Sequence, residues 1–281
     1  MRIDAHQHFW KLADRQGGWP GPELRAIHRD FGPGDLQAWL TRCGVEGTVL
    51  VQSMPTAQDT RWMLDLADLH PFVRGVVGWV DLLAADAGEQ LAALAGRAKF
   101  KGVRPMLQDL ADPRWIAQPQ LDAAASALSS LGLCFDALVR PAHLPALLEF
   151  AGRHPWLRIV IDHAAKPDIA SGATEPWATD IAAIARLANV HCKLSGLLTE
   201  AREGASANAL APYVDHLFKC FGPDRLMWGS DWPVLDLASD YATWMRCALE
   251  LCERHVGRGT AAIDAIFGGN AIRFYRLSAA A

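Results

Sequence analysis

The sequence lacks the patterns that most directly mark a membrane protein, a nucleic-acid binder or a disulfide scaffold. No apolar run approaches the ~20 residues that span a bilayer, and the opening residues contain no apolar targeting segment. Lysine and arginine nowhere cluster, and the formal net charge is −4, so neither nucleic acid nor a membrane is an expected partner. Six cysteines occur without a C-x-x-C pair or regular spacing. We therefore expect a reduced, cytoplasmic protein whose cysteines pack as small apolar side chains.

The chain is rich in apolar residues, and these alternate between two kinds of segment. Of its 281 residues 51% are hydrophobic, which excludes a disordered chain. Short runs rich in β-branched residues predict strands at 2–10, 47–52, 73–81, 100–106, 133–139, 158–165, 190–196 and 225–233. Apolar residues at three- and four-residue spacing predict helices at 34–44, 60–70, 120–132, 142–154, 211–222, 240–256 and 260–275.

Strands that alternate with helices imply parallel β-α units. Eight of them fit an α/β fold, a (β/α)8 TIM barrel that forms one domain over residues 1–281. A doubly wound open sheet is the alternative, although no G-x-G-x-x-G follows an early strand. Local signals support the helices: Asp35 is a candidate N-cap, and Gly44 and Gly132 stand where helices end.

Two long connections follow predicted strands at the end where barrel enzymes build their sites. Residues 11–34 are rich in glycine, proline and tryptophan, and residues 105–119 follow the fourth strand. Long loops in compact domains are usually functional or disordered. Trp19 and Trp115 favour ordered, packed segments over disorder.

The first predicted strand carries two histidines one residue apart. Because side chains alternate along a strand, His6 and His8 should share one face with Asp4. Near the carboxyl end of a barrel strand, that face points into the mouth. Two imidazoles there could ligate a divalent metal or hold a polar substrate; the alternative is a pair of hydrogen-bonded histidines that cap the core.

Two later strands end in similar groups. His163 and Lys166 stand where the sixth strand gives way to its loop, and Asp231 ends the eighth. Aspartate is depleted in strands and costly to bury unpaired. The position of Asp231 therefore indicates a functional role for its side chain; the alternative is that it caps the next turn. Three imidazoles and one carboxylate at the same rim form a plausible Zn²⁺ set.

Further polar residues should face the same opening. Arg104 and Asp136 lie on neighbouring strands, where a structural ion pair between them is an alternative to a functional role. The residues that we expect to bind substrate share a position on a strand end or long loop: Gln52, Arg104, Lys166, Lys193 and His28.

The sequence resembles the amidohydrolase superfamily, specifically its amidohydrolase-2 branch and the sugar-lactonase group within it. The motifs that carry the resemblance run along the whole chain in order: DAHQHFW, GVVGWVDL, GVRPMLQD, DALVRPAHLP, IDHAAKP, CKLSGL, RLMWGSDWP and GNAIRFY. Members of that group hydrolyse aldonolactones, including L-fuconolactone and L-rhamnonolactone, or lactones of aromatic catabolism. Some isomerise sugar lactones.

Carried onto this sequence, the resemblance places the family's H-x-H on His6 and His8, its sixth-strand histidine on His163 and its eighth-strand aspartate on Asp231. It implies one divalent metal on these four residues, Zn²⁺ first, or metal-independent action, since lactonases of this group also work without an ion. The fourth strand offers Arg104 and no inward lysine or glutamate that could bridge two metals, so a binuclear centre is not expected.

We therefore expect an enzyme of carbohydrate catabolism that opens a small-molecule lactone, with Asp231, His163, His6 and His8 as catalytic residues. A lactone is an easier electrophile than an amide, so a metal-free site is chemically credible. The alternatives are a lactone isomerase with the same site, a lactonase of aromatic catabolism and a non-catalytic barrel that binds a sugar acid. The sequence predicts neither the sugar configuration nor the oligomeric state.

Overall fold

In the part of the chain that the structure describes, eight parallel strands form one sheet whose spatial order follows the sequence. The computed structural model describes residues 1–15 and 18–278. Each strand pairs with the next along the chain, from β1 to β8. The strands are β1 (Ile3–Gln7), β2 (Gly47–Val51), β3 (Val73–Gly78), β4 (Phe100–Val103), β5 (Cys134–Ala137), β6 (Arg158–Ile161), β7 (Val190–Leu194) and β8 (Leu226–Trp228). All eight lie within the predicted runs. They are shorter than those runs because the polar residues at the carboxyl end of each run belong to the loop that follows the strand.

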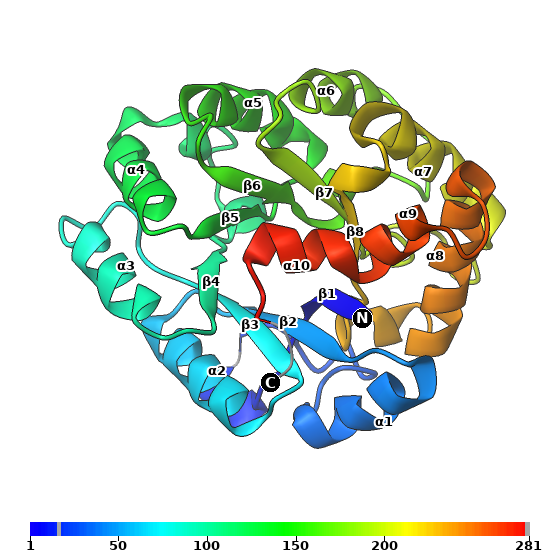
Figure 1. Cartoon of the computed structure of the whole chain (residues 1–281), viewed down its shortest axis with the longest axis horizontal. Coiled ribbons are helices and arrows are strands. Elements are labelled where there is room, and N and C mark those ends of the chain that lie inside the picture. Colours follow the sequence, from blue (N-terminus) through cyan, green and yellow to red (C-terminus); the bar gives the residue numbers. More distant parts are fainter. Residues whose placement is uncertain (16–17, 279–281) are drawn as a thin grey trace.

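Helices lie around the outside of the strands, except the last, which lies across one end of the barrel (Figure 1). They are α1 (Pro33–Cys43), α2 (Ala57–Leu69), α3 (Ala87–Ala95), α4 (Asp122–Ser130), α5 (Leu144–Arg153), α6 (Trp177–Ile184), α7 (Ala207–Phe221), α8 (Tyr241–Val256), α9 (Ala261–Asp264) and α10 (Asn270–Tyr275). The predicted (β/α)8 barrel is therefore confirmed. None of these helices is long and apolar enough to cross a membrane.

The barrel closes where the segment after β8 meets β1. Gln7 forms a parallel bridge with Trp232. The backbone N–H of His8 donates to Trp232 O at 2.8 Å, and that of Asp231 donates to His6 O at 2.8 Å. These bonds fix the end of the chain's first strand against the end of its last, so residues more than 220 positions apart lie side by side.

A register shift within β1 decides which side chains face the barrel interior. It lies between Asp4 and Gln7. Ile3 and Ala5 pack in the apolar barrel interior, whereas the Asp4 carboxylate accepts a hydrogen bond of 2.9 Å from the Tyr241 hydroxyl of the surrounding helix α8. The prediction that Asp4 shares a face with His6 and His8 is wrong, because the irregularity breaks the simple alternation.

Helix α10 closes the end of the barrel opposite the carboxyl ends of the strands, and Figure 1 shows it lying across that opening. Phe274 and Tyr275 pack with the apolar interior residues of the strands. The predicted continuous helix at 260–275 is interrupted by a π-helical segment, Ala265–Gly269. Within that segment a Cβ on Gly268 would lie 2.1 Å from the carbonyl oxygen of Met1. Only glycine at this position therefore lets the backbone of Met1 pack so close to the segment.

Helix ends follow the local signals with one exception. Gly44 has φ 64° at the end of α1, and Gly132 has φ 67° just after α4, as expected for terminating glycines. Asp35 stands in the first turn of α1 and not at the N-cap, which is Gly32. The Asp35 carboxylate accepts a hydrogen bond of 3.0 Å from Gly32 N, so it caps the helix from inside.

Candidate active site

A cavity of about 270 Å³ opens at the carboxyl ends of the strands. Its lining residues are His8, Trp19, Ser53, Arg104, Met106, Gln108, Asp109, Leu138, His163, Lys166, Asp231 and Val234. They come from strand ends and from both long connections. The first of these, 11–34, includes residues 16 and 17, which lie outside the described residues; Trp19 on it lines the cavity and Trp115 on the second does not.

One oxygen of Asp231 lies at the centre of three imidazoles. Asp231 Oδ1 is 3.2 Å from His8 Nε2, 3.7 Å from His6 Nε2 and 3.8 Å from His163 Nε2. All four residues are at most 4% exposed. The structure therefore brings together the four residues that the sequence singled out, from β1, the end of β6 and the end of β8. Asp231 is engaged by imidazoles, so the alternative that its side chain caps the next turn does not apply.

The segment after β6 presents His163 through an unusual backbone. His163, Ala164, Ala165 and Lys166 all have positive φ, between 51° and 61°. Four consecutive non-glycine residues in this region cost free energy that the surrounding packing must offset, and such strain is typical of functional sites. His163 Nδ1 lies 2.9 Å from Ser195 Oγ at the end of β7, which fixes the ring orientation.

Glycine makes the approach of β7 to His163 possible. Gly196 has φ +62°, and a Cβ there would lie 2.7 Å from His163 Nδ1. A larger residue at this position would push the imidazole out of place.

A buried ionic network supports the site from inside the barrel. Lys193 Nζ lies 2.6 Å from Asp136, 3.0 Å from Asp162 and 3.0 Å from His6 Nδ1. The Tyr275 hydroxyl of α10 donates to Asp136 at 2.7 Å, which links the closed end of the barrel to the site. The two carboxylates raise the pKa of Lys193 against the opposing effect of burial. Lys193 is fully buried beneath His6 and does not line the cavity.

Sequence reasoning missed Asp162 and Tyr275. Asp162 directly precedes His163 and is fully buried, and Arg104 lies 3.4 Å from it. Burial opposes the charge of Asp162, but Lys193 first, then His6 and Arg104, hold its pKa well below the ordinary value. Asp162 is a carboxylate at the end of an apolar strand, as Asp231 is, and this is the signal in the sequence that points to it.

Arg104 lines the cavity and is held by Gln52. Gln52 Nε2 donates to Arg104 O at 2.5 Å, and Arg104 Nη2 donates to Gln52 O. Gln52 itself is fully buried and does not line the cavity. The alternative of an ion pair between Arg104 and Asp136 is wrong, because Arg104 pairs with Asp162 and Asp136 with Lys193.

The two remaining predicted substrate-binding residues lie farther out. Lys166 lines the cavity and forms an ion pair of 3.1 Å with Glu200. His28 is exposed, its Nδ1 lies 2.9 Å from Pro20 O, and it does not line the cavity.

Burial keeps the three imidazoles neutral. It lowers the pKa of His163 to about 4, lowers that of His8, and lowers that of His6 well below its ordinary value with the help of the Lys193 charge. Burial would raise the pKa of Asp231, but the nearby imidazoles, His163 first, hold it below the ordinary value. Near neutral pH the site is an ionised carboxylate among neutral imidazoles.

This donor set fits a divalent cation. His8 Nδ1 lies 2.7 Å from Val51 O, an acceptor, so Nδ1 carries the hydrogen and Nε2 turns a lone pair toward Asp231. His8 Nε2 and the Asp231 carboxylate therefore face each other with lone pairs, and a cation between them would stabilise this arrangement. His6, His163 and Asp231 each offer a ligand atom, all within 4.8 Å of one another; His8 adjoins this group and is not part of it.

Comparison with known proteins identifies the family of the chain. The amidohydrolase family model matches residues 3–277. The chain belongs to the amidohydrolase family. An L-fucono-1,5-lactonase of Burkholderia ambifaria is 54% identical over 280 residues, which cover 99% of this chain and 96% of that protein. An L-fucono-1,5-lactonase of Burkholderia multivorans is 34% identical, with 99% and 96% of the two chains covered.

A solved structure of the family adds an observation on metal. The crystal structure of an amidohydrolase from Burkholderia multivorans with bound Zn matches with a TM-score of 0.93 and 33% identity, over 99% of this chain and 100% of that one. One crystal structure of a relative of the same fold thus contains Zn, and this chain has a His/Asp cluster that could hold a metal.

Proposed function

We propose that this amidohydrolase hydrolyses a sugar lactone of the L-fucono-1,5-lactone type, and that residues 1–281 act as one domain. The observation that carries the proposal is the convergence of Asp231 with His6, His8 and His163 in the cavity of a chain 54% identical to an L-fucono-1,5-lactonase. The cavity of about 270 Å³ accommodates a small molecule, and Trp19, 43% exposed, offers a flat apolar surface to one face of a sugar ring.

Asp231 is the general base in this proposal. It is ionised, its backbone is fixed by the bond to His6 O, and it lines the cavity. It accepts a proton from water while the water oxygen forms a bond to the lactone carbonyl carbon. The protonated carboxyl then returns that proton to the ring oxygen as the ester C–O bond breaks, which yields a hydroxy acid. A positioned base typically contributes ~10²–10⁴-fold.

Positive charge and hydrogen-bond donors must stabilise the oxyanion that forms on the carbonyl. Arg104 is 3% exposed, lines the cavity and is held in place by Gln52. It is the donor best placed for this role, and loss of one such donor typically costs ~10²–10³-fold. Lys166 lies at the cavity wall beside Glu200, where the pair binds the hydroxyl groups of the ring.

We assign one Zn²⁺ to His6, His163 and Asp231, with His8 beside them. Zn²⁺ bound there would act as a Lewis acid and lower the pKa of a bound water to about 7. Asp162 and Ser195 are then positioning residues: the Asp162 carboxylate lies 3.4 Å from His6 Nδ1 and the Ser195 hydroxyl oxygen 2.9 Å from His163 Nδ1, and each can accept the hydrogen of that nitrogen. The outer partners of metal-binding histidines fix ring orientation in this way.

A lactone panel tests the proposal. Acid release from L-fucono-1,5-lactone and its epimers is followed with a pH indicator, and NMR of the product separates a hydroxy acid from an isomerised lactone. We expect Asp231→Asn to lose at least ~10²-fold in kcat while the fold is retained. The exposed Asp224→Asn is the matched control. Full turnover by Asp231→Asn would refute the assigned base.

A further inference from the structure

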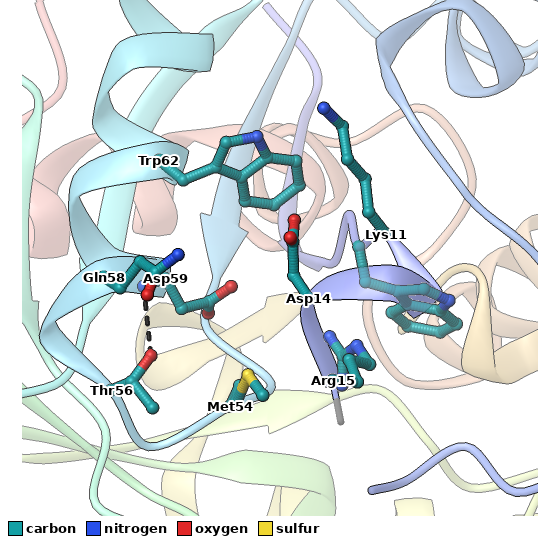
Figure 2. Close-up of a pocket in the computed structure, with 9 residues that line it drawn as sticks. Lys11, Asp14, Arg15, Met54, Thr56, Gln58, Asp59 and Trp62 are labelled. Carbon is teal, nitrogen blue, oxygen red and sulfur yellow. Dashed lines mark hydrogen bonds between the residues drawn. The ribbon is translucent and has the colours of Figure 1, made fainter. Parts of the chain in front are cut away.

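A second cavity lies beside the first, between the 3₁₀ turn Leu12–Arg15 and the start of α2. Its volume is about 170 Å³. Figure 2 shows the side chains of Asp14, Asp59 and Trp62 around one space, with Lys11 and Arg15 at its edge. It shares no lining residue with the catalytic cavity.

Arg15 forms the wall between the two cavities. It is 5% exposed; Nη2 donates to Ser53 Oγ at 2.6 Å and Nη1 to Trp19 O at 2.9 Å. Ser53 and Trp19 line the catalytic cavity, whereas Arg15 itself lines the second. Trp10 continues the wall, with its ring 5.4 Å from that of Trp19.

Polar groups of this cavity lack partners within the described part of the chain. Arg15 Nε and Asp59 Oδ2 are buried without a hydrogen bond. Buried polar atoms in native proteins are nearly always satisfied, so such an atom calls for a partner, which a ligand can supply. The side chains of Lys11, Asp14 and Gln58 stand around the same space and form no hydrogen bond or ion pair with any described residue.

We propose that this cavity is a second binding site, for a small polyhydroxylated carboxylate. Trp62 provides a flat apolar surface for the carbon face of such a molecule, and Asp14, Asp59 and Gln58 provide acceptors for its hydroxyls. Lys11 provides the charge that its carboxylate needs. The ligand class rests on the proposed function, because lactone hydrolysis produces a hydroxy acid of this kind next to the cavity.

Fluorine NMR on protein labelled with 5-fluorotryptophan tests the site directly. Each resonance is assigned by its loss in a Trp→Phe variant, and L-fuconate, the acid from L-fucono-1,5-lactone, is the probe. Trp62 reports the second cavity, Trp19 the catalytic cavity, and Trp156, which is 85% exposed and lines neither cavity, is the control. We expect the Trp62 resonance to shift saturably, with a dissociation constant different from that at Trp19, while Trp156 stays unchanged.

Variants and related probes identify the ligand class. Gln58→Ala and Asp14→Asn should weaken binding at Trp62 at least about threefold and leave binding at Trp19 unchanged. Lys11→Met should remove the preference for L-fuconate over the uncharged polyol L-fucitol. All three variants leave the proposed catalytic residues untouched, so hydrolysis should continue at the wild-type rate.

The outcomes separate this inference from the proposed function. A Trp62 resonance that does not move while Trp19 saturates overturns the second site, even in an enzyme that hydrolyses the lactone. A Trp62 shift that is equally strong with acetate or L-fucitol overturns the ligand class. A saturable, acid-specific Trp62 shift in a protein that fails to hydrolyse any lactone supports the site and rejects the proposed function.

Discussion

Lys193 and Asp136 form an ion pair of 2.6 Å inside the barrel, where neither side chain is exposed. Asp162 and His6 share the same ammonium group, so one lysine holds two carboxylates and an imidazole. A buried network of this kind is strongly destabilised when one member is removed, because the partner charges stay buried.

We expect Lys193→Met to lower the free energy of unfolding by about 3–5 kcal/mol, measured by urea denaturation. The matched control is Lys219→Met, since Lys219 is exposed and forms no hydrogen bond or ion pair with any residue the structure describes. The free energies of unfolding of the two variants should differ by most of this amount. Equal stability of both would mean that the network contributes nothing to the fold.

Zinc binding should raise the thermal stability of the metal-free protein. A ligand at 100 times its dissociation constant adds about 2.7 kcal/mol, which corresponds to a rise in Tm of roughly 5 °C for a large domain. We expect this rise in a scanning fluorimetry titration after chelator treatment, and a much smaller one in His163→Ala. If Zn²⁺ does not change the Tm and the chelator does not change the activity, the metal assignment is rejected.

The positions of the site residues along the chain could be predicted because parallel barrel strands end at one rim. That rule alone placed His163 and Asp231 together, although 68 residues separate them in the numbering. The same rule does not predict which of the charged side chains that point into the barrel form ion pairs with one another. Arg104 and Lys193 select Asp162 and Asp136 through the tilt and stagger of the strands, which no local pattern encodes.

Positions set by irregular backbone were also beyond sequence reasoning. The register shift in β1 turned Asp4 toward α8, and the left-handed segment after β6 aimed His163 at Asp231. The place of Trp19 depends on Arg15, whose contact partners are far apart in sequence. Such features follow from the whole packed barrel and not from periodicity.

Gly196→Ala should damage activity more than stability. The added Cβ would meet His163 Nδ1 at 2.7 Å, and the positive φ adds strain of about 1 kcal/mol. Gly172 is the matched control, since it has φ +77° and no atom within 4 Å of a built Cβ. We expect comparable strain in both alanine variants, but a loss of at least tenfold in kcat only in Gly196→Ala, when both are assayed at a temperature where they remain folded.

Asp59 should make stability depend on pH in an unusual direction. Burial raises its pKa from 3.8 to about 6, and the Arg15 charge offsets only part of that effect. The native state therefore binds a proton more tightly than the unfolded chain. Its contribution to stability is complete below pH 3.8 and is lost as the pH rises through about 6.

Asparagine has no carboxylate to ionise at this buried position. The free energy of unfolding of Asp59→Asn minus that of wild type should therefore increase by about 1–3 kcal/mol between pH 4 and pH 7. The lower part of this range reflects the partial exposure of the side chain. Urea denaturation at several pH values measures the difference, and Asp65→Asn on the exposed face of the same helix is the control. A difference between Asp59→Asn and wild type that stays constant with pH would show that Asp59 titrates alike in the folded and unfolded chain, and that the charge of Arg15 compensates its burial in full.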